Sequence, residues 1–171
     1  GISHDLRTPL TRLRLTAEIM ADKDLAEGMI LDIQDMDEIL EQFISFMRDG
    51  SEENLELIDM NQILTEVAAQ FSAQTVIEFS PEPLPDILIK RLAIKRMVGN
   101  LVNNALRYGK APIVLSAIQA RQQLVLTVRD HGVGIEESQI PELLQPFVRG
   151  EAARTTQGTG LGLAIVSRIV K

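Results

Sequence analysis

The spacing of apolar residues over the first 47 positions is the feature that most restricts how this chain can fold. Over residues 6–20 the apolar positions are separated alternately by four and three residues, and the same spacing returns over residues 29–47. Helices that pack side by side along a narrow seam carry this heptad pattern. Polar residues at positions 22–24 interrupt it. The pattern therefore predicts two antiparallel helices joined by a short link.

The second of these helices carries more apolar side chains than a single seam can bury. Leu31, Ile39 and Ile44 all lie away from the heptad line. Two hairpins packed together as a four-helix bundle would cover such residues, so we expect a homodimer formed through the helical hairpin. The alternative is that the hairpin packs against the second half of its own chain.

Composition excludes several classes of function. A formal net charge of −7 argues against a nucleic-acid partner, because contacts to phosphate groups require clustered Lys and Arg. The absence of cysteine excludes disulfides, thiol catalysis and cysteine-based zinc sites. No apolar run approaches the roughly 18 residues that a membrane span needs. We expect the chain to be a truncated piece of a longer protein, with any membrane attachment in segments absent from it.

A polar stretch around Gly50 separates the hairpin from a region with a different pattern. We place a hairpin domain at residues 1–50, a linker at 51–55 and a second domain at 56–171. The second domain predicts a mixed sheet covered by helices on one face, an α/β sandwich, so the whole chain is an α+β multidomain protein. Strands are expected at residues 55–58, 75–79, 86–90, 112–119 and 123–130, and helices at 59–71, 91–108, 140–144 and from 162 onward.

His4 is one of only two histidines in the chain. Leu6 lies about 200° around the helix from it, at ~100° per residue, so His4 is expected to face away from the seam. Thr8 is one turn further on and shares the face of His4, while Asp5 is its neighbour. Pro9 predicts a bend just after this group. A histidine beside a carboxylate can act as a nucleophile, although an ordinary surface histidine is the alternative.

The helix expected at residues 91–108 carries a polar cluster. Asn100 and Asn104 are one turn apart, and Arg107 and Tyr108 follow on the same broad face. Asn is a poor helix former, so its repetition here calls for a reason. An amide oxygen can ligate Mg²⁺, an arginine can meet phosphate and a tyrosine can flank a base. The alternative is a polar face turned to solvent.

Two glycine-rich runs follow this helix. Residues 130–135 come directly after an expected strand, and the carboxylate of Asp130 can accept a hydrogen bond from an adenine amino group. Residues 158–163 open the last helix, where backbone N–H groups favour phosphate. The second run is neither a Rossmann fingerprint nor a P-loop. The polar residues 151–157 before it suit a lid over phosphates. Taken alone, each glycine run could equally be a turn.

In this order, the motifs resemble those of the sensor histidine kinases of two-component systems, and of the osmosensor kinases among them. The ATP-binding domain of that family has the Bergerat fold, which is shared with Hsp90-like ATPases. The matching segments are residues 3–10 for the H box, 100–108 for the N box, 130–135 and 158–163 for the two glycine boxes, and 145–150 for the F-box segment.

The resemblance implies a role for each matching residue. His4 would accept the phosphoryl group, Asp5 would orient it, and Thr8 would position a water molecule for dephosphorylating the partner. Asn104 would ligate Mg²⁺, and Asp130 would bind the adenine amino group. The other residues implied to contact the nucleotide are Asn100, Arg107, Tyr108, Gly132, Gly134, Ile135, Phe147, Arg154, Gly158, Thr159, Gly160, Leu161 and Gly162.

The implied activity is ATP-dependent autophosphorylation on His4, followed by transfer to an aspartate of a response regulator. ATP and Mg²⁺ would be the cofactors, and an OmpR-like receiver domain would be the partner. The family also implies phosphatase activity toward the phosphorylated regulator, and a place in the cytoplasmic portion of a bacterial inner-membrane protein. The alternative is a dimeric ATP-binding sensor or scaffold, or a conformational ATPase, that transfers no phosphoryl group.

Overall fold

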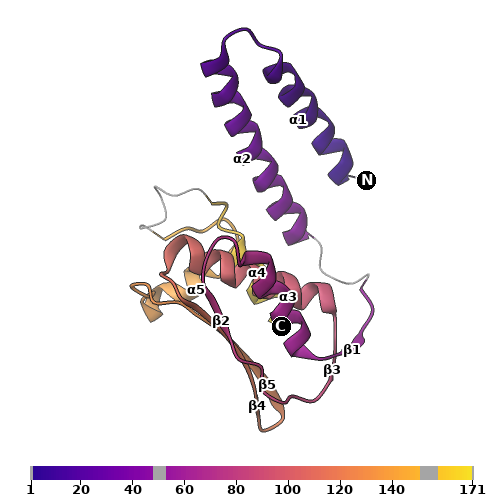
Figure 1. Ribbon diagram of the computed structural model, residues 1–171, viewed down its shortest axis with the longest axis vertical. Helices are drawn as coiled ribbons and strands as arrows, with labels where there is room; N and C mark the ends of the chain where they lie inside the picture. The colour runs from indigo at the N-terminus through magenta and orange to yellow at the C-terminus, as the bar shows by residue number, and fades with distance from the viewer. Residues whose placement is uncertain (1, 48–52, 151–157, 171) are drawn as a thin grey trace. The chain divides into compact units, whose positions relative to one another are not determined.

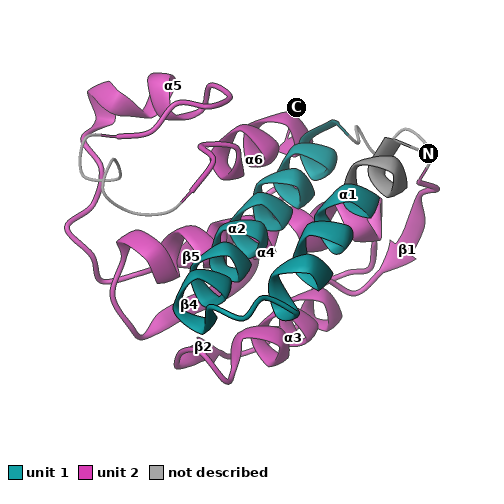
Figure 2. Cartoon of the chain, turned by 90° about the horizontal axis from the view of Figure 1, so that it is seen from above, with its two compact units in different colours: residues 1–48 teal, residues 49–171 magenta. Residues whose placement is uncertain are grey.

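The computed structural model describes residues 2–47, 53–150 and 158–170, with side chains from residue 7 onward. The chain divides into two compact units, Gly1–Arg48 and Asp49–Lys171 (Figure 2). Each unit has its own secondary structure and its own buried residues. No helix among the described residues is both long and apolar enough to cross a bilayer.

The first unit is a helical hairpin, as its heptad pattern predicts (Figure 1). Helix α1 (Ile2–Glu18) packs along helix α2 (Lys23–Met47). Asp22 starts α2, because its Oδ1 accepts a hydrogen bond from the N–H of Leu25 at 3.1 Å. This is a side-chain cap of an exposed helix end. The polar link is therefore shorter than expected, since its last two residues already belong to α2.

The hairpin buries only part of its apolar surface. Ala17, Ala26 and Ile33 are buried between the two helices. Other apolar side chains of both helices are exposed by about two-fifths or more, among them Leu13, Leu15, Ile19, Leu25, Leu31, Met36, Ile39, Phe43 and Met47. Four of these, Leu13, Met36, Phe43 and Met47, belong to the heptad pattern itself. A single hairpin therefore leaves much of its own seam uncovered.

The second unit contains two small sheets. Strands β2 (Ile77–Phe79), β4 (Ile113–Ala120) and β5 (Gln123–Arg129) form a mixed sheet in the order β2-β4-β5, with β2 parallel and β5 antiparallel to β4. Strands β1 (Glu56–Ile58) and β3 (Ile87–Ile89) pair with each other in a separate antiparallel sheet. The expected mixed sheet thus holds three of the strands rather than all of them.

Helices cover one face of the mixed sheet (Figure 1). Helix α3 (Met60–Phe71) begins at Asp59, whose Oδ1 accepts a hydrogen bond from the N–H of Asn61 at 2.9 Å. Helix α4 (Arg91–Tyr108) packs against α3, and helix α6 (Gly162–Val170) packs against α4. A 3-10 turn η1 (Glu137–Gln139) leads into the short helix α5 (Ile140–Leu143).

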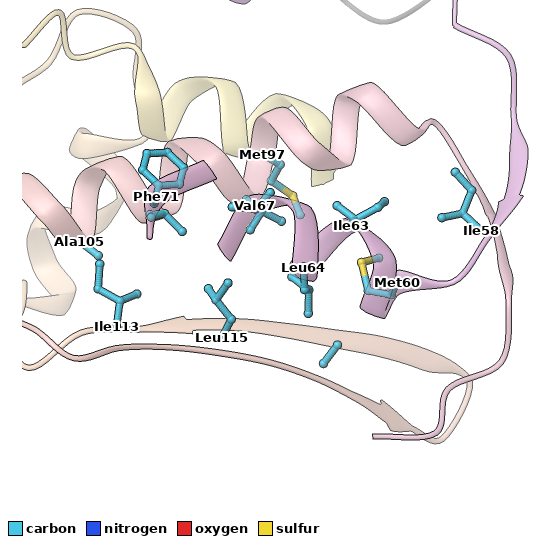
Figure 3. Packing of buried hydrophobic residues seen from close by; sticks show 13 residues of the cluster. Ile58, Met60, Ile63, Leu64, Val67, Phe71, Met97, Ala105, Ile113 and Leu115 are labelled. Carbon is cyan, nitrogen blue, oxygen red and sulfur yellow. The ribbon is translucent and has the colours of Figure 1, made fainter. Parts of the chain in front are cut away.

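The core of this unit lies between these helices and the mixed sheet, as Figure 3 shows. Leu64 of α3 points toward the sheet, from which Ile113 and Leu115 of β4 point back toward the helices, and all three are at most 1% exposed. Ile63 and Val67 of α3 are fully buried on the side nearer α4. On β4 the buried positions alternate with more exposed ones, as in a sheet covered on one face. The predicted combination of a helical hairpin with an α/β unit is confirmed.

Ion pairs join α3 to α4 beside this core. The carboxylate of Glu66 accepts a hydrogen bond from Lys95 Nζ at 3.0 Å and also pairs with Arg91. The hydrogen bond from Lys95 is the largest cause that holds the pKa of Glu66 below its ordinary value, and the positive charges of both neighbours act in the same direction. The two helices are thus linked by a contact that depends on an ionised carboxylate.

Candidate functional site

The candidate nucleotide site is built on the C-terminal half of α4. Val98, Val102 and Ala105 of this helix are buried in the core. Asn100 and Asn104 lie on another side of α4 and are partly buried, because the start of α6 covers them. A Cβ placed on Gly162 would lie 3.4 Å from Asn104 Oδ1 and 3.5 Å from Asn100 Oδ1. The polar cluster is therefore not simply a solvent face.

The side-chain amide of Asn104 is incompletely hydrogen-bonded. Its Nδ2 is buried and has no hydrogen-bond partner within the part of the chain that the structure describes. A buried unpaired polar atom is costly, so it points to a missing partner. The amide of Asn100, by contrast, donates to the carbonyl of Arg96 at 2.9 Å.

The oxygen of the Asn104 amide has the chemistry of a ligand for a magnesium ion whose other ligands come from phosphate and water. Among the described residues no group of three His, Cys, Asp or Glu could hold a metal ion. Mg²⁺ is often held by few protein oxygens and completes its shell with substrate phosphates and water. The amide oxygen of Asn104 is a suitable single ligand of this kind.

Asp130 is held between two glycines at the end of β5. Its Oδ1 accepts a hydrogen bond from the N–H of Gly132 at 2.7 Å. A Cβ placed on Gly109 would lie 2.4 Å from Asp130 Cγ, and one on Gly132 would lie 2.8 Å from Gly109 Cα. Neither position has room for a side chain, so the glycines fix how the carboxylate sits against the end of α4.

The residues of the first glycine run that follow Gly132 are exposed to solvent. Gly134 has a φ of +78°, a conformation that favours glycine. Val133 is 95% exposed and Ile135 is 54% exposed. Exposed apolar side chains beside Asp130 give this loop a surface on which the flat face of a base could rest.

The second glycine run connects the start of α6 with the segment around Phe147. Gly160 has a φ of +70°, and its Cβ would lie 2.6 Å from the carbonyl oxygen of Val148. The N–H of Phe147 donates to the carbonyl of Gly160 at 3.1 Å. Leu161 is 1% exposed, its N–H donates to Thr159 Oγ1 at 3.3 Å, and its carbonyl accepts from the N–H of Ile165 at 2.9 Å.

Three predicted contact residues lie on the rim of this region. A Cβ placed on Gly158 would lie 3.1 Å from Arg107 Nη1 and 3.2 Å from Tyr108 Oη. Both side chains are exposed, as is Phe147, which has a φ of +66° that a bulky residue seldom adopts. Arg154 and the rest of the expected lid, residues 151–157, lie outside the described residues.

The predicted acceptor group lies in the first unit. The backbone at His4 and Asp5 is part of α1, but their side chains lie outside the described residues. Thr8 is exposed on the same helix. Its neighbour Arg7 pairs with Glu41 of α2, with Asp37 Oδ1 4.0 Å from Arg7 Nε. That His4 faces away from the seam stays a prediction.

Comparisons with known proteins agree with these two units. The model of the His Kinase A (phospho-acceptor) domain matches residues 1–52. The model of the histidine kinase-, DNA gyrase B- and HSP90-like ATPase matches residues 89–171. The histidine kinase domain of the Escherichia coli osmosensor EnvZ is 45% identical, with 71% of this chain and 76% of that chain covered and a TM-score of 0.52. The chain belongs to the sensor histidine kinases.

The curated relatives of this histidine kinase chain are longer than the chain itself. The sensor histidine kinase GtrS of Pseudomonas aeruginosa is 37% identical over 99% of this chain and 35% of its own length. The sensor protein RstB of Escherichia coli is 34% identical over 99% of this chain and 42% of its own length. The chain therefore spans roughly two-fifths of these relatives. Full-length ShkA in complex with AMPPNP has a TM-score of 0.79 at 25% identity, with 98% of this chain and 39% of that chain covered.

The sequence of this kinase chain did not reveal every residue that shapes the site. In the sequence, Gly109 is only the residue that follows the helix expected at 91–108. Its φ of −96° is ordinary, and its close approach to Asp130 is what excludes a side chain. His131 stands within the glycine-rich residues 130–135 with no role of its own in the sequence pattern, and in the structure it makes two hydrogen bonds. Both functions depend on contacts with distant residues, which a linear pattern does not show.

Proposed function

We propose that this chain uses ATP to phosphorylate His4 and passes the phosphoryl group to an aspartate of a response regulator. The observation that carries the proposal is the buried, unpaired amide of Asn104 beside the glycine that opens α6. Because the unpaired atom is an N–H donor, it supports a ligand that accepts hydrogen bonds, such as a phosphate group. The oxygen of the same amide has the chemistry to ligate a cation. Membership in the histidine kinases supports a histidine as the acceptor.

Each part of the site would act on a different part of ATP. The N–H groups at the start of α6 and the charge of Arg107 would hold the phosphates. Asn104 would hold Mg²⁺, which would neutralise the charge that develops on the phosphoryl oxygens during transfer. Asp130 already uses Oδ1 to accept from Gly132, so its Oδ2 would accept from the adenine amino group.

The hairpin would supply the acceptor. A ring nitrogen of His4 would form a bond to the γ-phosphorus as the bond to the ADP oxygen breaks, and ADP would leave. Asp5 would hold the other ring nitrogen and so keep the attacking nitrogen unprotonated. A receiver domain of the OmpR type would then accept the phosphoryl group on an aspartate. Thr8 would place a water molecule for the phosphatase reaction.

The exposed apolar residues of the hairpin support a homodimer. Leu13, Met36 and Phe43 belong to the heptad pattern but are at least 39% exposed in a single chain. A second hairpin would bury them in a four-helix bundle. We place the chain in the cytoplasmic part of a bacterial inner-membrane sensor, where ATP and the regulator are available.

Two variants separate the acceptor from the nucleotide site. The full chain is incubated with Mg²⁺ and ATP labelled at the γ-phosphate, and ADP binding is measured in parallel. We expect His4→Gln to lose all labelling and to bind ADP normally, whereas Asn104→Ala loses the increase in ATP affinity that Mg²⁺ gives. Wild-type chain that binds Mg²⁺ and ATP but never becomes labelled would favour the alternative, a sensor or ATPase without transfer.

A further inference from the structure

His131 makes two hydrogen bonds that none of the roles above uses. Its backbone N–H donates to the carbonyl of Lys110 at 3.0 Å. Its ring Nδ1 lies 2.9 Å from the carbonyl oxygen of Pro112. A carbonyl oxygen can only accept, so the proton of the neutral ring must be on Nδ1, and Nδ1 donates. The ring therefore acts as a fixed donor in both its neutral and its protonated form.

These two hydrogen bonds join the loop after β5 to the connection between α4 and β4. Lys110 and Pro112 belong to the connection between α4 and β4, while His131 belongs to the loop that follows β5. Gly109, directly before that connection, closely approaches both Asp130 and Gly132. The loop cannot move away from the end of α4 unless both hydrogen bonds of His131 break.

We propose that His131 is a positioning residue that orients Asp130 toward the adenine amino group. The inference rests on the proposed nucleotide site. The ring of His131 is exposed, so the core does not depend on its packing. What the ring adds is a second hydrogen bond to the same connection, two residues beyond the one that the backbone N–H of His131 makes. Without it the carboxylate would keep its bond to Gly132 while the loop that carries both could shift.

The chemistry of asparagine and glutamine offers a matched pair of variants. The amide nitrogen of Asn lies as many bonds from Cβ as Nδ1 of histidine does, so His131→Asn can still donate to the carbonyl of Pro112. The amide nitrogen of Gln lies one bond further, close to the place of Nε2. His131→Gln and His131→Ala therefore both lack an N–H donor at the place of Nδ1, which faces the carbonyl of Pro112.

The test compares ADP with inosine diphosphate, whose base carries a carbonyl in place of the amino group. Dissociation constants of both are measured for the full chain, with Asp130→Asn as the reference for a lost base contact. We expect His131→Ala and His131→Gln to bind ADP about five- to tenfold more weakly, the size of one hydrogen bond. Inosine diphosphate should bind as in the wild type, and His131→Asn should restore ADP binding to within about twofold.

Two outcomes would overturn the inference. If His131→Ala binds ADP as tightly as the wild type does, the ring does not position Asp130. If it weakens ADP and inosine diphosphate equally, the ring only stabilises the fold. Wild-type chain with no preference for ADP over inosine diphosphate would instead refute the role of Asp130, and this inference with it. If the wild type prefers ADP to inosine diphosphate and His131→Ala keeps the same preference, only the role of His131 is refuted, and that of Asp130 stands.

Discussion

At the scale of single residues, the space around Asp130 decides which side chains the site tolerates. The carboxylate is enclosed by Gly109 and Gly132, and it accepts a hydrogen bond from the N–H of the latter. The enclosure holds a charged group at a defined place without burying it completely. A preorganised acceptor of this kind loses little conformational freedom when a ligand binds.

Gly109→Ala should therefore be costly for both stability and ADP binding. The new Cβ would lie 2.4 Å from Asp130 Cγ and 2.6 Å from the carbonyl oxygen of Ala105. Overpacking of this kind typically lowers the free energy of unfolding by about 1–3 kcal/mol. Urea denaturation and ADP titration of the variant measure the two effects.

Gly99→Ala, on the same helix, is the matched control for that change. Among the described residues, nothing lies within 4 Å of a Cβ placed on Gly99. Alanine within a helix is more stable than glycine by about 0.5–1 kcal/mol, so this variant should gain stability and bind ADP normally. Equal behaviour of the two variants would contradict the tight enclosure of Asp130.

At the scale of elements, the contact between α3 and α4 should make the second unit sensitive to acid. The pKa of Glu66 is lowered below its ordinary value of 4.5, first by the hydrogen bond from Lys95. A carboxylate with a lowered pKa adds stability that is fully present above the ordinary value and is lost as the pH falls through the lowered one. The loss should therefore occur below pH 4.5.

Glu66→Gln removes the charge and tests this pH dependence. Denaturant unfolding of both proteins is followed from about pH 6 to about pH 3. At about pH 6 the wild type should have the larger free energy of unfolding. The difference in this free energy between the two proteins should shrink as the pH falls toward about 3. A difference that stays constant over this range would show that the ionisation of Glu66 does not contribute.

Helix α4 begins with an unusual cap from a distant residue. Lys90, at the cap position, makes no side-chain hydrogen bond there. Instead the carboxylate of Glu53 accepts hydrogen bonds from the N–H groups of Leu92 and Ala93, the latter at 3.0 Å. Glu53 falls in the segment predicted as the linker, residues 51–55, whose boundaries stay a prediction. Part of that segment is thus bound to the helix that carries the candidate site.

Replacing Glu53 should destabilise the second unit by the free energy that an N-terminal cap contributes to a helix. We expect Glu53→Ala to lower the free energy of unfolding by about 1 kcal/mol, as the loss of an N-cap does. Glu56→Ala, a change of the same type at an exposed position of β1, is the control and should be close to neutral. Thermal unfolding followed by circular dichroism distinguishes the two variants. An equal loss of stability in both would contradict the capping role of Glu53.

At the scale of the whole molecule, local chemistry predicted where most elements begin and end. Asp59 is the first residue of the helix expected at 59–71, and it caps that helix by accepting a hydrogen bond from the N–H of Asn61. The pairing of Leu57 with Leu88 in a separate sheet could not be predicted in the same way, because both helix α3 and strand β2 lie between these two short strands in the sequence. Strand partners are chosen by long-range packing, which sequence spacing does not encode.

The candidate site shows the same limit. Asn104 and Asp130 could be proposed from the sequence because their side chains carry suitable chemistry in a known motif order. Gly109 and His131 could not, because their roles consist of a distance to Asp130 and a bond to Pro112. A sequence can thus suggest side chains with their own chemistry more readily than residues whose part lies in a contact with a distant neighbour.

The central claim is that the γ-phosphate of ATP is transferred to His4. The most direct measurement is peptide mapping of the phosphorylated chain by mass spectrometry, with digestion at neutral pH because phosphohistidine is lost in acid. We predict phosphate on the peptide that contains His4, on the ring itself, and its disappearance after acid treatment. Phosphate found instead on Thr8 or on another hydroxyl residue, and stable to acid, would contradict the account.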